Sequence, residues 1–283
     1  MTDTDHRPEQ RHGTDVGARD GRRLLEFDSV RLSFKGVKAI DGISFNVDQG
    51  ELYSIIGPNG AGKTSIFNCI NQVYRPQEGD IRWKGESVMG VKPNRTAELG
   101  IARTFQNIAL FAHMTVLDNI LTGRHARMKH GWLAGAFWVG KAKKEELENR
   151  FHVEDIIDFL EIEQWRKYPV GLLPYGIQKR VELGRALAMD PELLLLDEPV
   201  AGMNLEETED MARFILDIQD ELGITMILVE HDMGLVMDIA DRVMVVDFGR
   251  KIAEGPPAEV QRNPDVIKAY LGEEFEEPAL AAD

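Results

Sequence analysis

One glycine-rich octapeptide has the residue types and spacing needed to hold the phosphates of a nucleotide. Residues 57–64 read Gly-Pro-Asn-Gly-Ala-Gly-Lys-Thr, which fits the pattern G-x-x-x-x-G-K-[ST] at every fixed position. Glycines let the backbone turn so that successive N–H groups face phosphate oxygens. The lysine adds a positive charge toward the β- and γ-phosphates, and the threonine hydroxyl is a ligand for Mg²⁺. The segment predicts a nucleoside triphosphate site whose candidate residues are Gly57, Pro58, Asn59, Gly60, Ala61, Gly62, Lys63, Thr64 and Ser65.

A second chemical feature is an acidic pair at the end of an apolar run. Residues 193–196 are leucines, and Asp197 and Glu198 follow them. A buried parallel strand delivers the residue at its carboxyl end to the place where α/β folds bind ligands. There Asp197 is suited to hold Mg²⁺ through water, and Glu198 can act as a base toward an attacking water. Taken alone, the pair also fits a strand end capped by solvated acids.

Alternating strands and helices are predicted around both features. Half-buried or buried strands are indicated at residues 24–34, 43–47, 52–56, 81–85, 193–197, 225–229 and 242–246. Helical periodicity covers residues 116–189 and 206–222. This order predicts an α/β fold with a mostly parallel sheet covered on both faces, and a helical block inserted between two halves of that sheet.

Composition and charge limit the classes of function. The chain has 283 residues, with 33 Lys plus Arg against 48 Asp plus Glu, and a formal net charge of −15. This balance disfavours a protein that binds nucleic acid through overall positive charge. The single cysteine, Cys69, cannot form an internal disulfide and lies in an apolar run, so we expect a core residue in a reducing compartment.

The ends of the chain and its hydropathy indicate where it works. Residues 1–23 contain no apolar segment like that of a signal peptide, and no apolar run approaches the roughly 20 residues that a spanning helix needs. We expect a disordered tail at 1–23 and an acidic, solvated tail at 272–283. The sequence thus predicts a cytoplasmic protein, or one held at a membrane by partners.

With both motifs identified, the chain resembles the ATP-binding subunits of ABC transporters over about residues 24–271. Other motifs of that family occur in the family's order, which is far more specific than any one of them. They are an adenine-stacking aromatic at Phe34, a Q-loop at 104–107, a signature at 173–180, a D-loop at Gly202, Met203 and Asn204, and a switch histidine within 229–232. Taken singly, Phe34 also fits a core residue, Gln106 an ordinary loop residue, and His231 a helix cap or a solvated histidine.

The resemblance implies a fold and a set of roles. The fold is a P-loop NTPase (RecA-like) core with a mostly parallel sheet, an antiparallel β subdomain and a helical subdomain inserted at about 107–189. Catalytic roles are implied for Glu198, His231 and Gln106, and contacts to Mg²⁺ for Thr64, Gln106 and Asp197. Two such subunits sandwich ATP, each molecule lying between the P-loop of one and the signature of the other.

The signature departs from the family pattern L-S-G-G-Q. Pro174 replaces the serine, Tyr175 the first glycine and Ile177 the glutamine, whereas Gly176 is kept. Proline offers neither a hydroxyl nor an N–H, so one donor toward the phosphate of the opposite subunit is missing. Because proline is tolerated in the first turn of a helix, the amides of Tyr175 and Gly176 can still face that phosphate. We expect a weakened but working signature.

Other segments resemble the branched-chain amino acid importer branch of the family, in particular its larger, LivG-like ATPase. They are residues 100–106, 110–111 and 114–119, residues 263–273, and a basic, aromatic insertion at about 123–150. For the insertion alone, a loop with a surface helix is favoured over a lipid contact. The resemblance implies a second ATPase subunit (a paralogue or an identical copy), transmembrane permeases and, indirectly, an external substrate-binding protein, at the cytoplasmic face of the plasma (inner) membrane. Nucleic acid is not an expected partner.

Alternative functions share these motifs. The chain could energise a transporter of urea, amides or lipopolysaccharide-type substrates, because specificity lies in the permease and the binding protein. A soluble ABC ATPase that acts on DNA or ribosomes is disfavoured, since a second cassette and a long coiled-coil insertion are both absent. A non-catalytic ATP-gated clamp is disfavoured by the presence of both Glu198 and His231.

Overall fold

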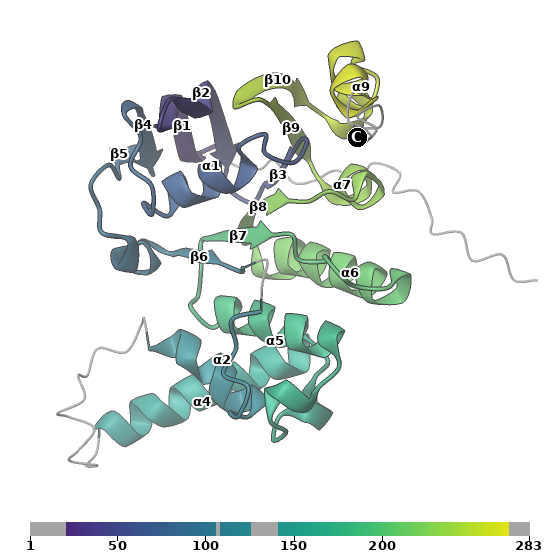
Figure 1. The fold of residues 1–283 in the computed structure, drawn as a ribbon. Helices are drawn as coiled ribbons and strands as arrows, with labels where there is room; N and C mark the ends of the chain where they lie inside the picture. The colour runs from purple at the N-terminus through teal and green to yellow at the C-terminus, as the bar shows by residue number, and fades with distance from the viewer. Residues whose placement is uncertain (1–20, 106–107, 126–140, 272–283) are drawn as a thin grey trace, which may run out of the picture.

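The computed structural model describes residues 21–105, 108–125 and 141–271 (Figure 1). The predicted terminal tails therefore lie outside the described residues, apart from Gly21, Arg22 and Arg23, the last of which begins β1. Most of the insertion predicted near 123–150 also lies outside them.

Two sheets form the upper part of the molecule in Figure 1. The first is antiparallel, with order β2-β1-β4-β5. Its strands are β1 (Arg23–Phe34), β2 (Val37–Asp48), β4 (Glu78–Trp83) and β5 (Glu86–Ser87). The second has order β10-β9-β3-β8-β7-β6 and is parallel except where β10 pairs with β9. Its strands are β3 (Leu52–Ile56), β6 (Ile101–Arg103), β7 (Leu193–Asp197), β8 (Thr225–Val229), β9 (Arg242–Asp247) and β10 (Arg250–Gly255).

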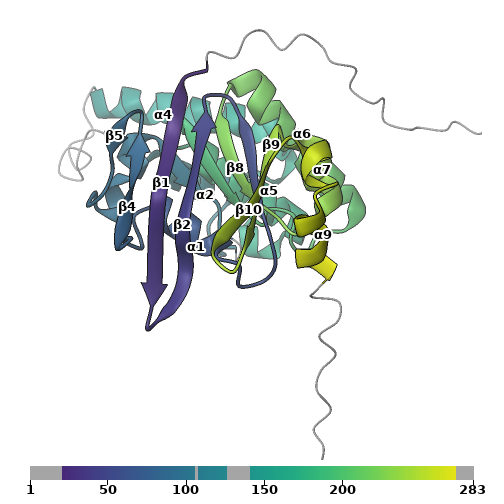
Figure 2. The same cartoon turned by 90° about the horizontal axis from the view of Figure 1, so that it is seen from above.

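Helices cover the parallel sheet and form a separate layer below it (Figure 1). The longer ones are α1 (Lys63–Ile70), α2 (Val116–Arg124), α4 (Lys141–Phe159), α5 (Tyr175–Leu187), α6 (Leu205–Leu222), α7 (Met233–Ile239) and α9 (Pro264–Leu271), with α8 (Pro257–Val260) as a single turn. Short 3₁₀ turns occur at Pro93–Arg95, Ala97–Leu99, Glu163–Trp165 and Val170–Leu172. Figure 2 shows the long strands β1 and β2 of the antiparallel sheet side by side, with the shorter β4 next to β1.

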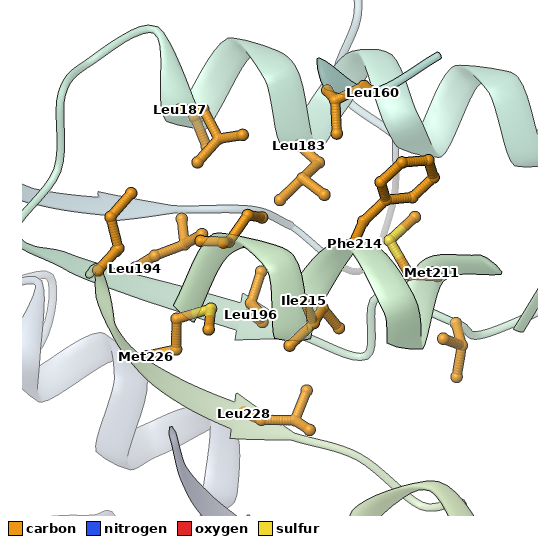
Figure 3. Packing of buried hydrophobic residues seen from close by; sticks show 14 of the residues in the cluster. Leu160, Leu183, Leu187, Leu194, Leu196, Met211, Phe214, Ile215, Met226 and Leu228 are labelled. Carbon is orange, nitrogen blue, oxygen red and sulfur yellow. The ribbon is translucent and has the colours of Figure 1, made fainter. Parts of the chain in front are cut away.

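Strand β7 lies between β8 and β6 in the parallel sheet and is buried on both of its faces. Its four leucines are fully buried, and alternate ones belong to different hydrophobic clusters. Leu194 and Leu196 pack with α5 and α6 beside Met226 and Leu228 of β8, as Figure 3 shows. Leu193 and Leu195 point to the opposite face, toward α1 and the antiparallel sheet. A run of leucines without alternation is what a strand covered on both faces requires.

Local sequence signals account for the ends of the helices next to this sheet. Asn204 accepts a hydrogen bond from the Glu207 N–H, and the Glu207 side chain accepts one from the Asn204 N–H, so α6 starts with a capping box. Gly223 ends α6 with φ 65°, a left-handed conformation that glycine adopts without strain. The capping box fixes the residue at which α6 starts, and Gly223 fixes the residue at which it ends.

The predicted architecture is confirmed: an antiparallel β subdomain, a mostly parallel sheet and a helical layer contributed by the middle of the chain. Cys69 is buried as expected, and burial raises the pKa of its thiol to about 12. Strand β6 was not predicted from periodicity, because three residues are too short to show any. Among the described residues, no helix combines the length and apolar character needed to cross a bilayer.

Candidate functional site

The glycine-rich loop joins β3 to the first turn of α1, and three of its glycines have positive φ. Gly57 has φ 148°, and a Cβ there would lie 2.0 Å from the Val246 carbonyl oxygen. Gly62 has φ 108°, and a Cβ there would lie 2.3 Å from the Ala39 carbonyl oxygen. Gly60 has φ 79°, and a Cβ there would meet nothing within 4 Å. The loop is therefore packed against neighbouring backbone at its two ends and open at its centre.

This contrast predicts different costs for alanine at two glycines of one loop. We expect Gly62→Ala to lower the free energy of unfolding by at least about 3 kcal/mol, since a left-handed conformation and a backbone collision both oppose it. Gly60→Ala meets only the first penalty, about 1 kcal/mol. Denaturant unfolding of both variants measures the difference. Equal costs would mean that the loop relaxes away from Ala39.

Lys63 is buried at the start of α1. Its Nζ donates to the carbonyl oxygens of Gly57 and, at 3.0 Å, of Pro58. The ammonium group thus lies inside the loop that it follows in sequence. The neighbouring Thr64 is exposed in the first turn of α1, where the helix end carries a partial positive charge. The arrangement gives one charged donor, one hydroxyl and a helix N-terminus around a single loop.

Asp197 ends β7 and is buried in an ion pair that sequence reasoning did not predict. Arg103, the last residue of β6, donates to Asp197 Oδ2 at 2.6 Å and to Asn68 Oδ1 of α1 at 2.7 Å. The guanidinium also lies 5.4 Å from the ring centre of Phe67 and 5.3 Å from that of Phe105. Arg103 therefore connects the acidic strand end, α1 and Phe105 of the Q-loop. The sequence gives no signal for this contact, because a three-residue strand shows no periodicity that would place Arg103 beside Asp197.

Glu198 and His231 meet at the carboxyl ends of adjacent strands. His231 Nε2 lies 2.6 Å from Glu198 Oε1, and the imidazole is about half exposed. Glu198 has φ 48°, a positive value, and its N–H donates to the Val229 carbonyl at 2.9 Å. A carboxylate and an imidazole at this distance can share a proton, which is the arrangement that proton transfer to or from water uses.

The two acids beside His231 have separate tasks. Asp232 caps α7, because its Oδ1 accepts the Leu235 N–H at 3.0 Å. Glu230 is buried, and its carboxylate accepts the N–H groups of Val200 and His231 at 3.0 and 2.9 Å. Burial raises the pKa of Glu230, although these backbone N–H groups oppose the shift. The alternative reading of His231 as a helix cap is wrong, since Asp232 fills that role.

The predicted adenine contact lies at the end of β1. Phe34 is 43% exposed, and its ring centre lies 4.9 Å from that of Tyr74 in an edge-to-face arrangement. The alternative of a core residue does not fit this exposure. An aromatic face supported at its edge and open to solvent is able to stack on a planar base.

The signature and D-loop residues contact one another within the chain. Pro174 is the N-cap of α5 and makes no side-chain cap hydrogen bond, while Tyr175 begins the helix and Gly176 and Ile177 continue its first turn. Tyr175 Oη donates to the carbonyl oxygen of Ala201 at 3.1 Å, next to Gly202 of the D-loop. Met203 packs against the hydrophobic cluster, and Asn204 caps α6. The D-loop is thus attached to the signature helix.

Gln106 and Asn107 lie outside the described residues, so the predicted contact of Gln106 with Mg²⁺ and water is not placed. The residues on either side approach α5: Glu182 Oε1 accepts the Phe105 N–H at 3.4 Å, and Arg185 donates to the Ala109 carbonyl. A groove of about 500 Å³ opens here, lined by residues of the sheet side and of α2 and α5, among them Arg103, Phe105, Thr122 and Arg185.

Comparison with known proteins agrees with this geometry. The family described as ABC transporter matches residues 40–201, and the family described as branched-chain amino acid ATP-binding cassette transporter matches residues 250–276. The chain is 39% identical over 252 residues to the high-affinity branched-chain amino acid transport ATP-binding protein BraF of Pseudomonas aeruginosa, covering 89% of this chain and 99% of BraF.

Two further relatives support the same assignment. The chain is 37% identical over 250 residues to the protein LivG of Salmonella typhimurium, whose name has the same wording, covering 88% of this chain and 98% of LivG. The crystal structure of the ADP conformation of MJ1267, an ATP-binding cassette of an ABC transporter, superimposes with a TM-score of 0.77 at 31% identity, covering 88% of this chain and 99% of that one. The chain belongs to the ATP-binding proteins of ABC transporters and, within them, to the branched-chain amino acid type.

Proposed function

We propose that this ABC ATPase powers the import of branched-chain amino acids through separate permease subunits. The observation that carries the hydrolytic part is that the P-loop, Asp197 and the Glu198–His231 pair all lie at the carboxyl ends of the neighbouring parallel strands β3, β7 and β8. The proposed substrate is based on the relatives BraF and LivG, whose names state branched-chain amino acid transport. It is also based on the family match of residues 250–276.

In the proposed mechanism, each residue positions or polarises one part of ATP. Phe34 stacks on the adenine, and the backbone N–H groups of residues 57–65 surround the phosphates. Lys63 exchanges its carbonyl partners for the β- and γ-phosphates. Glu198 takes the proton of the attacking water, and His231 stabilises the charge that develops on the γ-phosphate. Catalysis of this kind depends mainly on positioning and electrostatics.

Mg²⁺ fits the oxygen donors present here. Asp197 offers a carboxylate whose Oδ2 is engaged by Arg103, and Thr64 offers a hydroxyl at the start of α1. We propose that these two residues, together with Gln106, hold the ion. When bound, Mg²⁺ neutralises charge between the β- and γ-phosphates.

Partner subunits complete the proposed machine. A second ATPase subunit, identical or paralogous, presents its signature to the P-loop of this chain and receives Pro174, Tyr175, Gly176 and Ile177 at its own site. The groove between α2, α5 and the sheet side receives a helix of the permease, because it combines apolar walls with Arg103 and Arg185. The chain then lies at the cytoplasmic face of the plasma (inner) membrane, and an external binding protein delivers the substrate to the permease.

The division of the chain follows from these partners. We propose that residues 24–271 form one ATP-binding unit, in which the helical subdomain at about 107–189 faces the permease. The parallel sheet and the antiparallel subdomain then face the nucleotide.

Pro174 offers a direct test of the altered signature. Because proline at the N-cap supplies no hydroxyl, Pro174→Ser adds a donor toward the phosphate held by the opposite subunit. A hydrogen bond to a charged group contributes about 1.5–3 kcal/mol, so we expect ATP turnover of the assembled complex to rise roughly tenfold. Steady-state phosphate release measures this. Unchanged turnover and unchanged ATP affinity would show that the missing hydroxyl has no effect.

The substrate is tested by reconstituting the chain with its permeases and binding protein in vesicles. We expect ATP-dependent uptake of leucine, isoleucine and valine, and no uptake of urea. Vesicles with the Glu198→Gln variant serve as the control for coupling to hydrolysis. Uptake of urea without uptake of leucine would contradict the proposed substrate, but not the ATPase activity.

A further inference from the structure

We propose that Glu230 is a positioning residue that joins the two loops of the hydrolytic pair and so transmits the position of the D-loop to His231. The proposal rests on the roles given above to Glu198 and His231. Glu230 comes directly after β8 and directly before His231, but its side chain does not point to solvent as its neighbour's does.

The contacts of Glu230 span two segments that are thirty residues apart. Oε1 accepts the Val200 N–H at 3.0 Å, in the loop after β7, and Oε2 accepts the His231 N–H at 2.9 Å, in the loop after β8. A hydrogen bond from the Asp232 N–H also lowers the pKa of this carboxylate, against the effect of burial. One carboxylate therefore serves as a common acceptor for both loops.

A further hydrogen bond makes this connection rigid. Glu198 N–H donates to the Val229 carbonyl at 2.9 Å, so the loops are joined on both sides of Glu230. Between them, the side chains of Glu198 and His231 meet at 2.6 Å. Displacement of Val200 must consequently move the backbone of His231, because a buried carboxylate with two bound N–H groups cannot release one without leaving a polar group unsatisfied.

Val200 connects this bridge to the D-loop. Its neighbour Ala201 accepts the hydrogen bond from Tyr175 Oη, and Gly202 follows directly. The loop after β7 is thus held by Glu230 on the side of the sheet and by Tyr175 on the side of the signature helix. A second subunit that contacts the D-loop changes the distance between Glu198 and His231 through Glu230.

The activity test is a double-mutant cycle in the purified chain assembled with its partners. Glu230→Gln keeps the shape but replaces one acceptor oxygen with an NH₂ group, so we expect kcat to fall about tenfold with the KM for ATP changed less than about twofold. In a His231→Ala background, the same change should have almost no further effect. Glu230→Asp keeps the charge but shortens the reach, and we expect it to behave like Glu230→Gln.

The matched control is Glu51→Gln. Glu51 is also a buried carboxylate whose pKa is raised by burial, and it also accepts a backbone N–H, that of Asp48. It lies just before β3, at the opposite end of the strand from the P-loop, and pairs with Arg242. We expect Glu51→Gln to lower stability while kcat and KM stay unchanged.

Amide hydrogen exchange of the chain without partners gives a second readout that does not depend on activity. In Glu230→Gln, the amides of Val200 and His231 should exchange faster together, by about tenfold or more, whereas Glu51→Gln should leave both unchanged. Unaltered exchange at Val200, additive effects in the cycle, or wild-type kinetics in Glu230→Asp would each overturn the proposal. Absence of hydrolysis in the wild type would instead contradict the roles of Glu198 and His231. The exchange measurement would still test whether Glu230 joins the two loops, because it does not depend on activity.

Discussion

Replacing Glu198 with glutamine is expected to reduce ATP hydrolysis about 10²- to 10⁴-fold, the range that a general base contributes. The amide is nearly the same size as the carboxylate, so the loop after β7 keeps its hydrogen bond to Val229. It cannot take a proton from water, and it faces His231 with an amide in place of the carboxylate. Steady-state phosphate release in the assembled complex measures the loss.

Binding of ATP by the same variant should stay within about threefold of wild type, because Glu198 acts on water rather than on the nucleotide. Glu98→Gln is a suitable control. Glu98 is an exposed carboxylate that pairs with Arg95, and it is far along the chain from both Glu198 and His231. Hydrolysis at the wild-type rate in Glu198→Gln would show that Glu198 is not the base that activates water.

Lys63→Ala is expected to raise the dissociation constant for ATP by about tenfold to a hundredfold. A charged hydrogen bond contributes about 1.5–3 kcal/mol, and this ammonium is buried within the loop that surrounds the phosphates. Isothermal titration with Mg²⁺ and ATP gives the affinity directly. The variant also leaves the carbonyl oxygens of Gly57 and Pro58 without their donor, so some loss of stability accompanies the loss of binding.

Stability has to be separated from binding in that experiment. Lys92→Ala removes an exposed lysine of the same chain and should change neither property. Denaturant unfolding without nucleotide reports how much of the effect comes from the loop itself. Wild-type affinity in Lys63→Ala would mean that the phosphates bind elsewhere.

Much of the fold could be predicted because the signals were long or chemically specific. The leucine run of β7 has no alternation, which is typical of a strand covered on both faces, and the structure covers both. The P-loop pattern placed α1 correctly, because glycines at 57 and 62 and a lysine at 63 serve both the turn and the helix start. Motif order then predicted the antiparallel subdomain, which no single strand pattern would give.

What could not be predicted are contacts between side chains that are distant in sequence. Arg103 reaches Asp197 across 94 positions, and the pairing depends on β6 lying next to β7, which a three-residue strand does not announce. In the sequence, Glu230 is an acid next to His231 like Asp232, and nothing there distinguishes a buried acceptor from a solvated one. Such roles follow from strand order rather than from local pattern.

The central claim is that ATP binds with its phosphates in the P-loop, and ligand-induced stabilisation tests it most directly. A ligand that binds only the folded state at one hundred times its dissociation constant raises the free energy of unfolding by about 2.7 kcal/mol. We predict a gain of this size for the wild-type chain with Mg²⁺ and ATP, and a much smaller gain for Lys63→Ala at the same concentration. The same gain in both proteins, or none in the wild type, would contradict it.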